Sequence, residues 1–179
     1  MNEEDDQTLV RRCREGDRSA FEQLVRRYQK PVFNVAFRML HDPQDALDVS
    51  QTTFLKAFEH LAGYDPSFKF YSWIYRIALN ESLNALGSRK SFVQIDEEQP
   101  DVAPGPERQV ESEQTGRAIE DALMRINPEL RTVVVLRHLL HLSYQDMGEI
   151  LQLPEKTVKS RLYSARQVLR DQLQQQKVN

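Results

Sequence analysis

The chain has 179 residues, of which 40% are hydrophobic, and a formal net charge of −3 at pH 7. This length allows one large domain or two small ones, and the single cysteine, Cys13, excludes an internal disulfide. The acidic start MNEEDD and the lack of a long apolar run argue against a secretory signal or a membrane span, so we expect a soluble, cytoplasmic protein.

The sequence predicts an all-α protein built of two small helical domains. Helix-forming residues are abundant, there are only six glycines, and the alternating apolar pattern of strands is scarce. We expect the first domain at residues 1–90 and the second at 113–179. Residues 91–112 are rich in acid, proline and glutamine and cannot bury enough apolar surface to fold alone, which predicts a flexible acidic linker.

Two helices are predicted at the start of the first domain. The first covers Thr8 to Glu15, and Asp17 can cap a second helix that runs to about Met39. Apolar residues recur at helical spacing along the second helix, so one of its faces is expected to lie in a core.

A third helix is predicted from Asp42, an N-cap followed by a first-turn proline, to about Leu61. Its inward-facing residues are expected to be Leu47, Phe54, Phe58 and Leu61. Its outward stripe is mostly acidic and comprises Asp45, Asp48, Thr52, Leu55 and Glu59. Because an exposed leucine among carboxylates suits a partner more than water, we predict a protein-binding surface here, made of Asp45, Asp48, Gln51 and Leu55.

Residues 63–70 are expected to form a loop, followed by a helix from about Tyr71 to Leu86. Several aromatic residues near this loop stand beside Lys69 and suit stacking on unpaired bases: Tyr64, Phe68, Phe70 and Tyr71. Trp73 is expected to pack in the core. A polar stripe along the helix comprises Arg76, Asn80 and Asn84, with Arg89 and Lys90 beyond its end.

In the second domain, one helix is predicted over residues 113–125, and Asn127-Pro128 can cap another that runs to about His138. A helix-turn-helix should follow. Ser143 and Asp146 form a capping-box pattern at the start of its first helix, which continues to about Leu151. Gly148 within that helix suggests a close approach of two elements.

The second helix of this pair begins near Pro154 and has two distinct faces. Its apolar stripe is Val158, Leu162, Ala165 and Leu169. Residues 154–170 carry five cations against Glu155 alone, a net charge of +4. Such a face suits a reader of the DNA major groove, although a helical hairpin with a solvated basic face would show the same pattern. The candidate DNA-binding residues are Lys156, Thr157, Lys159, Ser160, Arg161, Tyr163, Ser164, Arg166 and Arg170.

Four stretches, occurring in order, carry a family resemblance: DPQDALDVSQTTFLKAF, FYSWIYRIALN, INPELRTVVVLRHLLHLSYQDMGEIL and EKTVKSRLYSARQVL. From about Thr8 to Leu173 the chain resembles the bacterial extracytoplasmic-function (ECF) sigma factors, group 4 of the sigma-70 family, and looks closest to the envelope-stress type. It departs from the family pattern at Asn84, where aspartate is frequent, at Ser164, where arginine is frequent, and at Gly148, where alanine is frequent.

The resemblance implies an alternative sigma factor that binds core RNA polymerase and directs promoter-specific transcription initiation, in a stress or envelope response. Residues 1–90 would act as sigma region 2, which binds the polymerase clamp through the acidic stripe and opens the −10 element. Its −10 residues would be Phe68, Lys69, Tyr71, Arg76, Asn80, Asn84 and Arg89. Residues 113–179 would act as region 4, which reads the −35 element. Some members are held inactive by an anti-sigma factor, often a membrane protein. No cofactor, metal or small-molecule substrate is expected.

Two other functions remain open from the residues alone. A homodimeric helix-turn-helix regulator would bind a palindromic site without polymerase, but it leaves the acidic stripe and the loop aromatics unexplained. An enzyme could use Asp45 and Asp48, which share one helix face. No histidine shares that face, and the four histidines show no metal-ligand spacing, so catalysis is not expected.

The length of the linker constrains how the two domains meet a promoter. Its 22 residues would span roughly 25 Å as a relaxed coil, whereas two elements about two DNA turns apart are separated by roughly 70 Å. The free protein is therefore expected to bind a whole promoter poorly until polymerase holds the domains apart. A further hypothesis is that the two domains pack together in the free protein and hide their DNA-binding faces.

Overall fold

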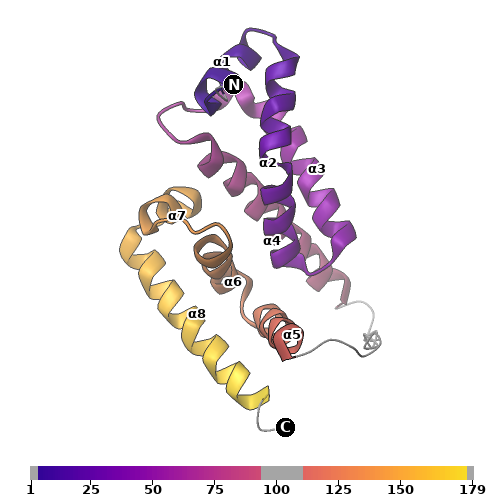
Figure 1. Ribbon diagram of the computed structural model, residues 1–179, viewed down its shortest axis with the longest axis vertical. Coiled ribbons are helices and arrows are strands. Elements are labelled where there is room, and N and C mark those ends of the chain that lie inside the picture. Colours follow the sequence, from indigo (N-terminus) through magenta and orange to yellow (C-terminus); the bar gives the residue numbers. More distant parts are fainter. Residues whose placement is uncertain (1–3, 94–110, 177–179) are drawn as a thin grey trace.

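The structure is a computed structural model that describes residues 4–93 and 111–176. Every regular element in these ranges is a helix, which confirms the all-α prediction for the described residues (Figure 1). The elements are α1 (Asp6–Arg14), α2 (Arg18–Leu40), α3 (Pro43–His60), the 3₁₀ turn η1 (Leu61–Gly63), α4 (Phe70–Val93), α5 (Glu111–Arg125), α6 (Pro128–Val134), the π-helical turn η2 (Val135–Leu139), α7 (Tyr144–Leu151) and α8 (Glu155–Gln176). No described helix has both the length and the apolar character needed to cross a membrane.

Helices α1–α4 form one module and α5–α8 form a second beside it (Figure 1). Their starts follow from local chemistry. The Asp17 side chain accepts a hydrogen bond from the Ser19 amide at the start of α2, and Asp42 accepts one from the Asp45 amide at the start of α3. Each bond satisfies a backbone donor that the first helical turn leaves free.

The buried face of α3 is made of small residues, namely Ala46, Val49, Thr53 and Ala57. Small side chains let α3 pack closely against α2 and α4. The prediction that the large apolar residues face inward is therefore wrong for two of them, since Leu47 is 43% exposed and Phe58 is 51% exposed. Phe58 packs edge-on against Phe21 at the rim, with 5.0 Å between ring centroids.

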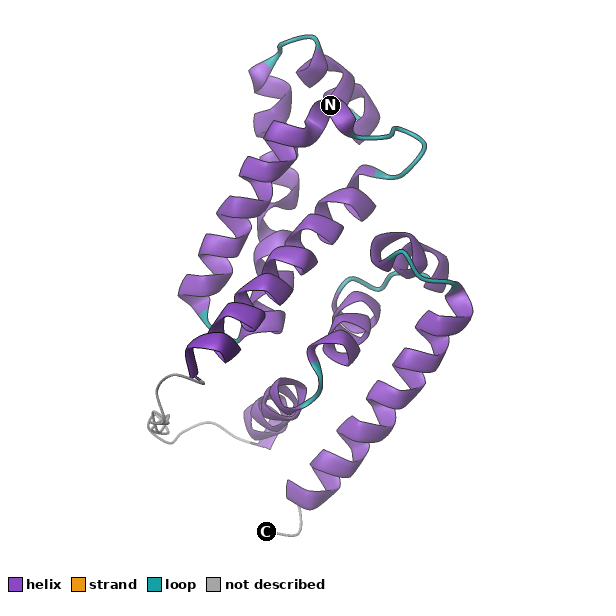
Figure 2. Ribbon diagram, turned by 180° about the vertical axis from the view of Figure 1, so that it is seen from behind, coloured by secondary structure: helices purple, strands orange, loops and turns teal. Residues whose placement is uncertain are grey.

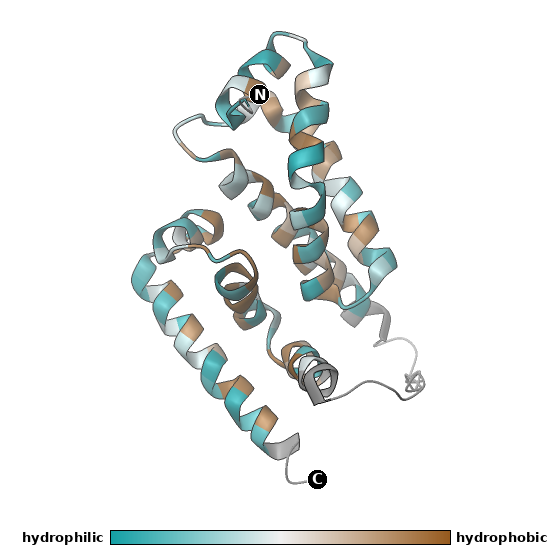
Figure 3. Ribbon diagram, viewed as in Figure 1, coloured by the Kyte–Doolittle hydropathy of each residue, from teal (hydrophilic) through white to brown (hydrophobic). Residues whose placement is uncertain are grey.

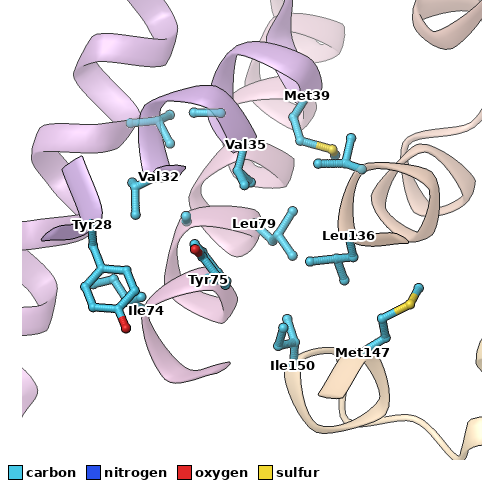
Figure 4. Packing of buried hydrophobic residues seen from close by; sticks show 14 of the residues in the cluster. Tyr28, Val32, Val35, Met39, Ile74, Tyr75, Leu79, Leu136, Met147 and Ile150 are labelled. Carbon is cyan, nitrogen blue, oxygen red and sulfur yellow. The ribbon is translucent and has the colours of Figure 1, made fainter. Parts of the chain in front are cut away.

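A continuous apolar core joins the two modules. Figure 4 shows side chains of α2 and α4, among them Met39 and Leu79, close to Leu136, Met147 and Ile150 of the second module. Within the second module, the brown positions of α8 lie toward α6 and its teal positions lie outward (Figure 3). Burying apolar area across the contact favours a closed arrangement of the modules.

A buried cation, Arg131, lies at the same contact with only 4% of its surface exposed. Its guanidinium donates to the carbonyl oxygens of Leu123 (2.8 Å) and Met124 (2.7 Å), and also to that of Met39 in the first module. Carbonyls at the C-terminal ends of α5 and α2 carry partial negative charge, so two helix ends share one cation. Desolvation lowers the pKa of Arg131.

Both ends of the stretch predicted as a linker, residues 91–112, are helical. Helix α4 continues through Val93 and α5 begins at Glu111. The prediction of a flexible acidic linker concerns mainly residues 94–110, which lie outside the described residues.

Candidate nucleic-acid interface

The helix-turn-helix is built as its capping pattern predicts. Ser143 Oγ accepts a hydrogen bond from the Asp146 amide at 3.1 Å and donates one to the Asp146 carboxylate at 2.6 Å. Gln152, with a left-handed φ of 54°, ends α7. A Cβ on Gly148 would lie 2.8 Å from the Leu153 carbonyl oxygen. The predicted close approach is therefore present, and the neighbour is the backbone of the turn.

Helix α8 presents a polar, cationic face to solvent. Val158, Leu162 and Ala165 are buried, whereas Tyr163 is 67% exposed. Thr157 and Arg161 are half-buried. The remaining candidate DNA-binding residues are all exposed: Lys156, Lys159, Ser160, Ser164, Arg166 and Arg170.

Two cations near the start of α7 meet on one aromatic ring, an arrangement that the sequence reasoning missed. The charged ends of Arg137 and Lys159 lie 5.0 Å and 5.2 Å from the centroid of Tyr144. Cation–π contacts of this kind hold long side chains in place. The available signal was an aromatic residue directly after the N-cap Ser143, on the basic side of the helix pair.

Arg161 turns back from the exposed face of α8. Its guanidinium lies 3.4 Å from the Glu129 carboxylate in α6. Arg161 also lines a cavity of about 280 Å³ between the two modules, together with Arg76 and Asn80 of α4. One candidate for the −35 element and two for the −10 element therefore lie around one space.

The aromatic residues near the loop divide into two groups. Tyr64 and Phe70 are 3% and 2% exposed, and both pack against Trp73, with ring centroids 5.2 Å and 5.7 Å from it. The prediction that Tyr64 and Phe70 stack on bases is therefore wrong, because their rings complete the core beneath the loop. Trp73 packs there as predicted, while Phe68 is exposed and Tyr71 is half-buried.

Three candidate −10 residues contact α7 of the other module, toward which the loop before α4 projects (Figure 2). Lys69 Nζ and Tyr71 Oη donate to the Asp146 carboxylate at 2.9 Å and 2.8 Å. Arg76 Nε donates to the Ile150 carbonyl at 3.1 Å, and a second guanidinium nitrogen of Arg76 donates to the Glu149 carbonyl. Asn80, Asn84 and Arg89 lie on the exposed side of α4.

The Asp146 carboxylate is ionised at neutral pH. Burial alone would raise its pKa, but hydrogen bonds from Ser143, Lys69 and Tyr71 hold that pKa at about 2. The hydrogen bonds that the Lys69 ammonium donates to Tyr71 and to Asp146 raise the pKa of Lys69. Both partners therefore keep their opposite charges throughout the physiological range.

The predicted protein-binding stripe lies along α3. Asp48 accepts a hydrogen bond from Gln44 at 3.2 Å, while Gln51 and Leu55 are exposed. Asp45 forms an ion pair with Arg89, one of the candidate −10 residues. Beside the stripe runs a groove of about 660 Å³ between α2 and α3, lined by Val25, Gln29, Lys30, Phe33, Leu47, Ser50, Gln51 and Phe54. The exposed Leu47 therefore adds apolar surface next to the stripe.

In the described part of the chain, the histidines, the cysteine and the carboxylates form no group of three or more that could hold a metal ion. What the geometry defines is an all-α protein with a helix-turn-helix and, on its other module, an apolar and acidic surface suited to a protein partner.

Comparison with known proteins identifies the family. The model of Sigma-70 region 2 matches residues 24–92, and that of Sigma-70, region 4 matches residues 116–169. The chain is 33% identical over 187 residues to the RNA polymerase sigma-H factor of Pseudomonas aeruginosa, covering 97% of this chain and 96% of that protein. It is 34% identical over 181 residues to the ECF RNA polymerase sigma-E factor of Haemophilus influenzae, covering 94% and 95%. Against the ECF sigma factor SigW of Bacillus subtilis it is 31% identical over 176 residues, covering 92% and 94%.

Two solved structures share the fold. CnrH in complex with the cytosolic domain of CnrY matches with a TM-score of 0.71 and 24% identity, covering 94% of this chain and 97% of that one. The sigma factor RpoE in complex with the anti-sigma factor NepR from Bartonella quintana matches with a TM-score of 0.70 and 22% identity, covering 86% and 96%.

The chain belongs to the ECF sigma factors of the sigma-70 family. It is an alternative sigma factor, which binds core RNA polymerase and directs promoter-specific transcription initiation. We refer below to α1–α4 as region 2 and to α5–α8 as region 4. The family assignment argues against the homodimeric regulator, because that alternative does not account for matches to both sigma regions. The sigma factors as a family are not enzymes.

Proposed function

We propose that this sigma factor uses three separate surfaces in transcription initiation. The exposed face of α8 reads the −35 element, the loop before α4 with the outer face of α4 holds the −10 strand, and α3 with its neighbouring groove binds the polymerase clamp. The observation that carries the proposal is the two-sided character of α8, with Val158, Leu162 and Ala165 buried and a continuous cationic face in solvent.

For the −35 element, position on α8 separates base readers from phosphate contacts. Ser160 and Arg161 are proposed to contact bases, because arginine can donate two hydrogen bonds to guanine. Arg161 would have to leave its ion pair with Glu129 to do so. Lys159, Arg166 and Arg170 are proposed to contact phosphates. Tyr144 supports this role for Lys159, since the cation–π contact at 5.2 Å orients the ammonium group before DNA arrives.

For the −10 element, Phe68 offers an exposed ring for stacking on an unpaired base, and the amides of Asn80 and Asn84 can donate and accept hydrogen bonds at a base edge. Exchanging residues 64–69 for those of a relative should transfer that relative's −10 preference. An unchanged preference would mean that the base pocket lies elsewhere.

For polymerase, the groove between α2 and α3 adds apolar contact area to the carboxylates of the stripe. The exposed side chains of Leu47 and Leu55 would be buried on binding, and Asp45 and Asp48 would meet cations of the clamp. Asp48→Arg should weaken assembly of holoenzyme. Glu15→Arg, which makes the same charge change at an exposed position outside α3 and its groove, is the matched control.

We also propose that the protein acts in the cytoplasm, where core polymerase is, and that it contributes no catalytic step of its own. An anti-sigma factor is a further proposed partner, as the RpoE structure described above is a sigma factor bound to the anti-sigma factor NepR. Co-purification of the chain from its own cells, with and without the inducing stress, tests for that partner.

A further inference from the structure

Helix α7 of region 4 presents hydrogen-bond acceptors to region 2. The Asp146 carboxylate meets Lys69 and Tyr71, and the carbonyls of Glu149 and Ile150, at the negative end of the helix, meet Arg76. A DNA strand offers the same chemistry, namely anionic phosphate oxygens and neutral base acceptors. Acceptors from within the chain thus occupy these donors of region 2.

The Asp146 carboxylate is held in place for these contacts. Its side chain is 14% exposed, and Ser143 Oγ donates to one of its oxygens while Lys69 and Tyr71 donate to the other. Charge-assisted hydrogen bonds at such a site are stronger than those between solvated surface groups. Specific hydrogen bonds therefore hold α7 against region 2, in addition to the apolar packing around them.

The −35 face of region 4 stays open in the same arrangement. Lys156, Lys159, Ser160 and Tyr163 are exposed on α8. The described contacts of Lys159, with Glu155 and Tyr144, both lie within region 4. Of the −35 candidates, Arg161 alone lines the cavity between the modules. The hypothesis that both DNA-binding faces are hidden is thus wrong for most of the −35 face.

We propose that α7 is an internal competitor for single-stranded promoter DNA at region 2, and that it leaves the −35 face of α8 free. This inference rests on the proposed −10 role of Lys69, Tyr71 and Arg76. Its consequence is an order of events. The free protein can meet duplex DNA through region 4, whereas region 2 takes a single strand only after the modules separate. By linkage, a single strand bound to region 2 favours the separated state.

A substitution in α7 outside the proposed DNA-binding residues tests the competition. Asp146→Asn removes the charge that attracts Lys69 and keeps an oxygen that can accept from Ser143. Glu149→Gln is the matched control, because it removes one charge from the same helix. Within the described part of the chain, the Glu149 side chain forms no hydrogen bond or ion pair. Asp146→Gln preserves the capping-box pattern and is the second variant if Asp146→Asn fails to fold.

The full-length proteins are titrated into a fluorescein-labelled single strand of random sequence and, separately, into a random duplex. Apparent affinity scales with the fraction of open molecules. Asp146→Asn should therefore bind the single strand about three- to ten-fold more tightly than wild type. It should bind the duplex no differently from Glu149→Gln and show a larger radius of gyration in small-angle scattering. Glu149→Gln should match wild type in single-strand affinity and in radius.

Three results would overturn the inference. If both variants gained equally in single-strand affinity, the gain would result from the change in net charge and not from the loss of the Asp146 contacts. A larger radius without tighter single-strand binding would mean that α7 does not block the site. No change in either quantity would mean that the Asp146 contacts do not hold the modules together. The proposed −10 role fails separately, if holoenzyme carrying Lys69→Ala or Arg76→Ala opens promoters as well as wild type.

Discussion

Replacing Arg131 by methionine should destabilise region 4. Arg131 is 4% exposed as a residue. Methionine keeps much of its apolar stem and removes the guanidinium, which donates to the carbonyls of Leu123, Met124, Ile126 and Met39. Leu123 and Met124 lie in the last turn of α5 and Ile126 directly follows it, so most of the loss falls within region 4. The contact with Met39 adds a smaller effect between the modules.

The size of the effect follows from two opposing contributions. A hydrogen bond to a charged group contributes about 1.5–3 kcal/mol, and a buried acceptor left without a donor costs about 1–3 kcal/mol. Against this, removing a buried cation relieves a desolvation penalty of several kcal/mol. Since the carbonyls stay in place and lose their shared donor, we expect a net loss of about 2–4 kcal/mol in the free energy of unfolding.

Urea unfolding followed by circular dichroism measures this loss. Arg125→Met, at an exposed position of α5, is the matched control and should change stability by less than about 0.5 kcal/mol. Arg131→Lys should fall between the two, because an ammonium group keeps the charge but cannot reach all of the acceptors. If Arg131→Met is as stable as wild type, desolvation outweighs the hydrogen bonds and the reasoning is refuted.

Three further substitutions test other parts of the account. Gly148→Ala should cost about 1–2 kcal/mol in urea unfolding, because its Cβ would stand 2.8 Å from the Leu153 carbonyl; a more stable variant would mean that the turn yields easily. Asp48→Arg should weaken core polymerase binding about ten-fold or more, as a repelled contact of about 1.4 kcal/mol predicts, and wild-type affinity would make the stripe a merely solvated face. Arg161→Ala should change −35 sequence preference by about 1–3 kcal/mol at one base position. Arg170→Ala should weaken binding to all sites alike and lower the slope of log affinity against log salt concentration by about one. Equal losses that do not depend on sequence would contradict the division between base and phosphate contacts.

Local chemistry made much of the fold predictable. Asp17, Asp42 and Ser143 cap their helices as expected because a cap depends on the few residues that follow it. The stripe Val158, Leu162 and Ala165 is buried for a similar reason, since its spacing requires one face of a single helix.

Features that depend on packing between helices were not predictable in the same way. On α3 the side chains that reach the core are small, and only the distance between α3 and its neighbours determines this. Tyr64 and Phe70 have the composition of base-stacking residues, but the core beneath the loop accommodates both rings. The contact of Asp146 with Lys69 joins residues 77 positions apart, so no local sequence pattern predicts it.

Run-off transcription with purified core polymerase on a promoter library tests whether this chain directs promoter-specific initiation. We expect transcripts only when the chain is added, starting downstream of a shared pair of −35 and −10 elements. We also expect that variants in α8 alter the first element and variants in the loop before α4 alter the second. Two results would contradict this function. One is transcription that does not depend on the chain, and the other is tight, sequence-specific binding of a whole promoter by the free protein without polymerase.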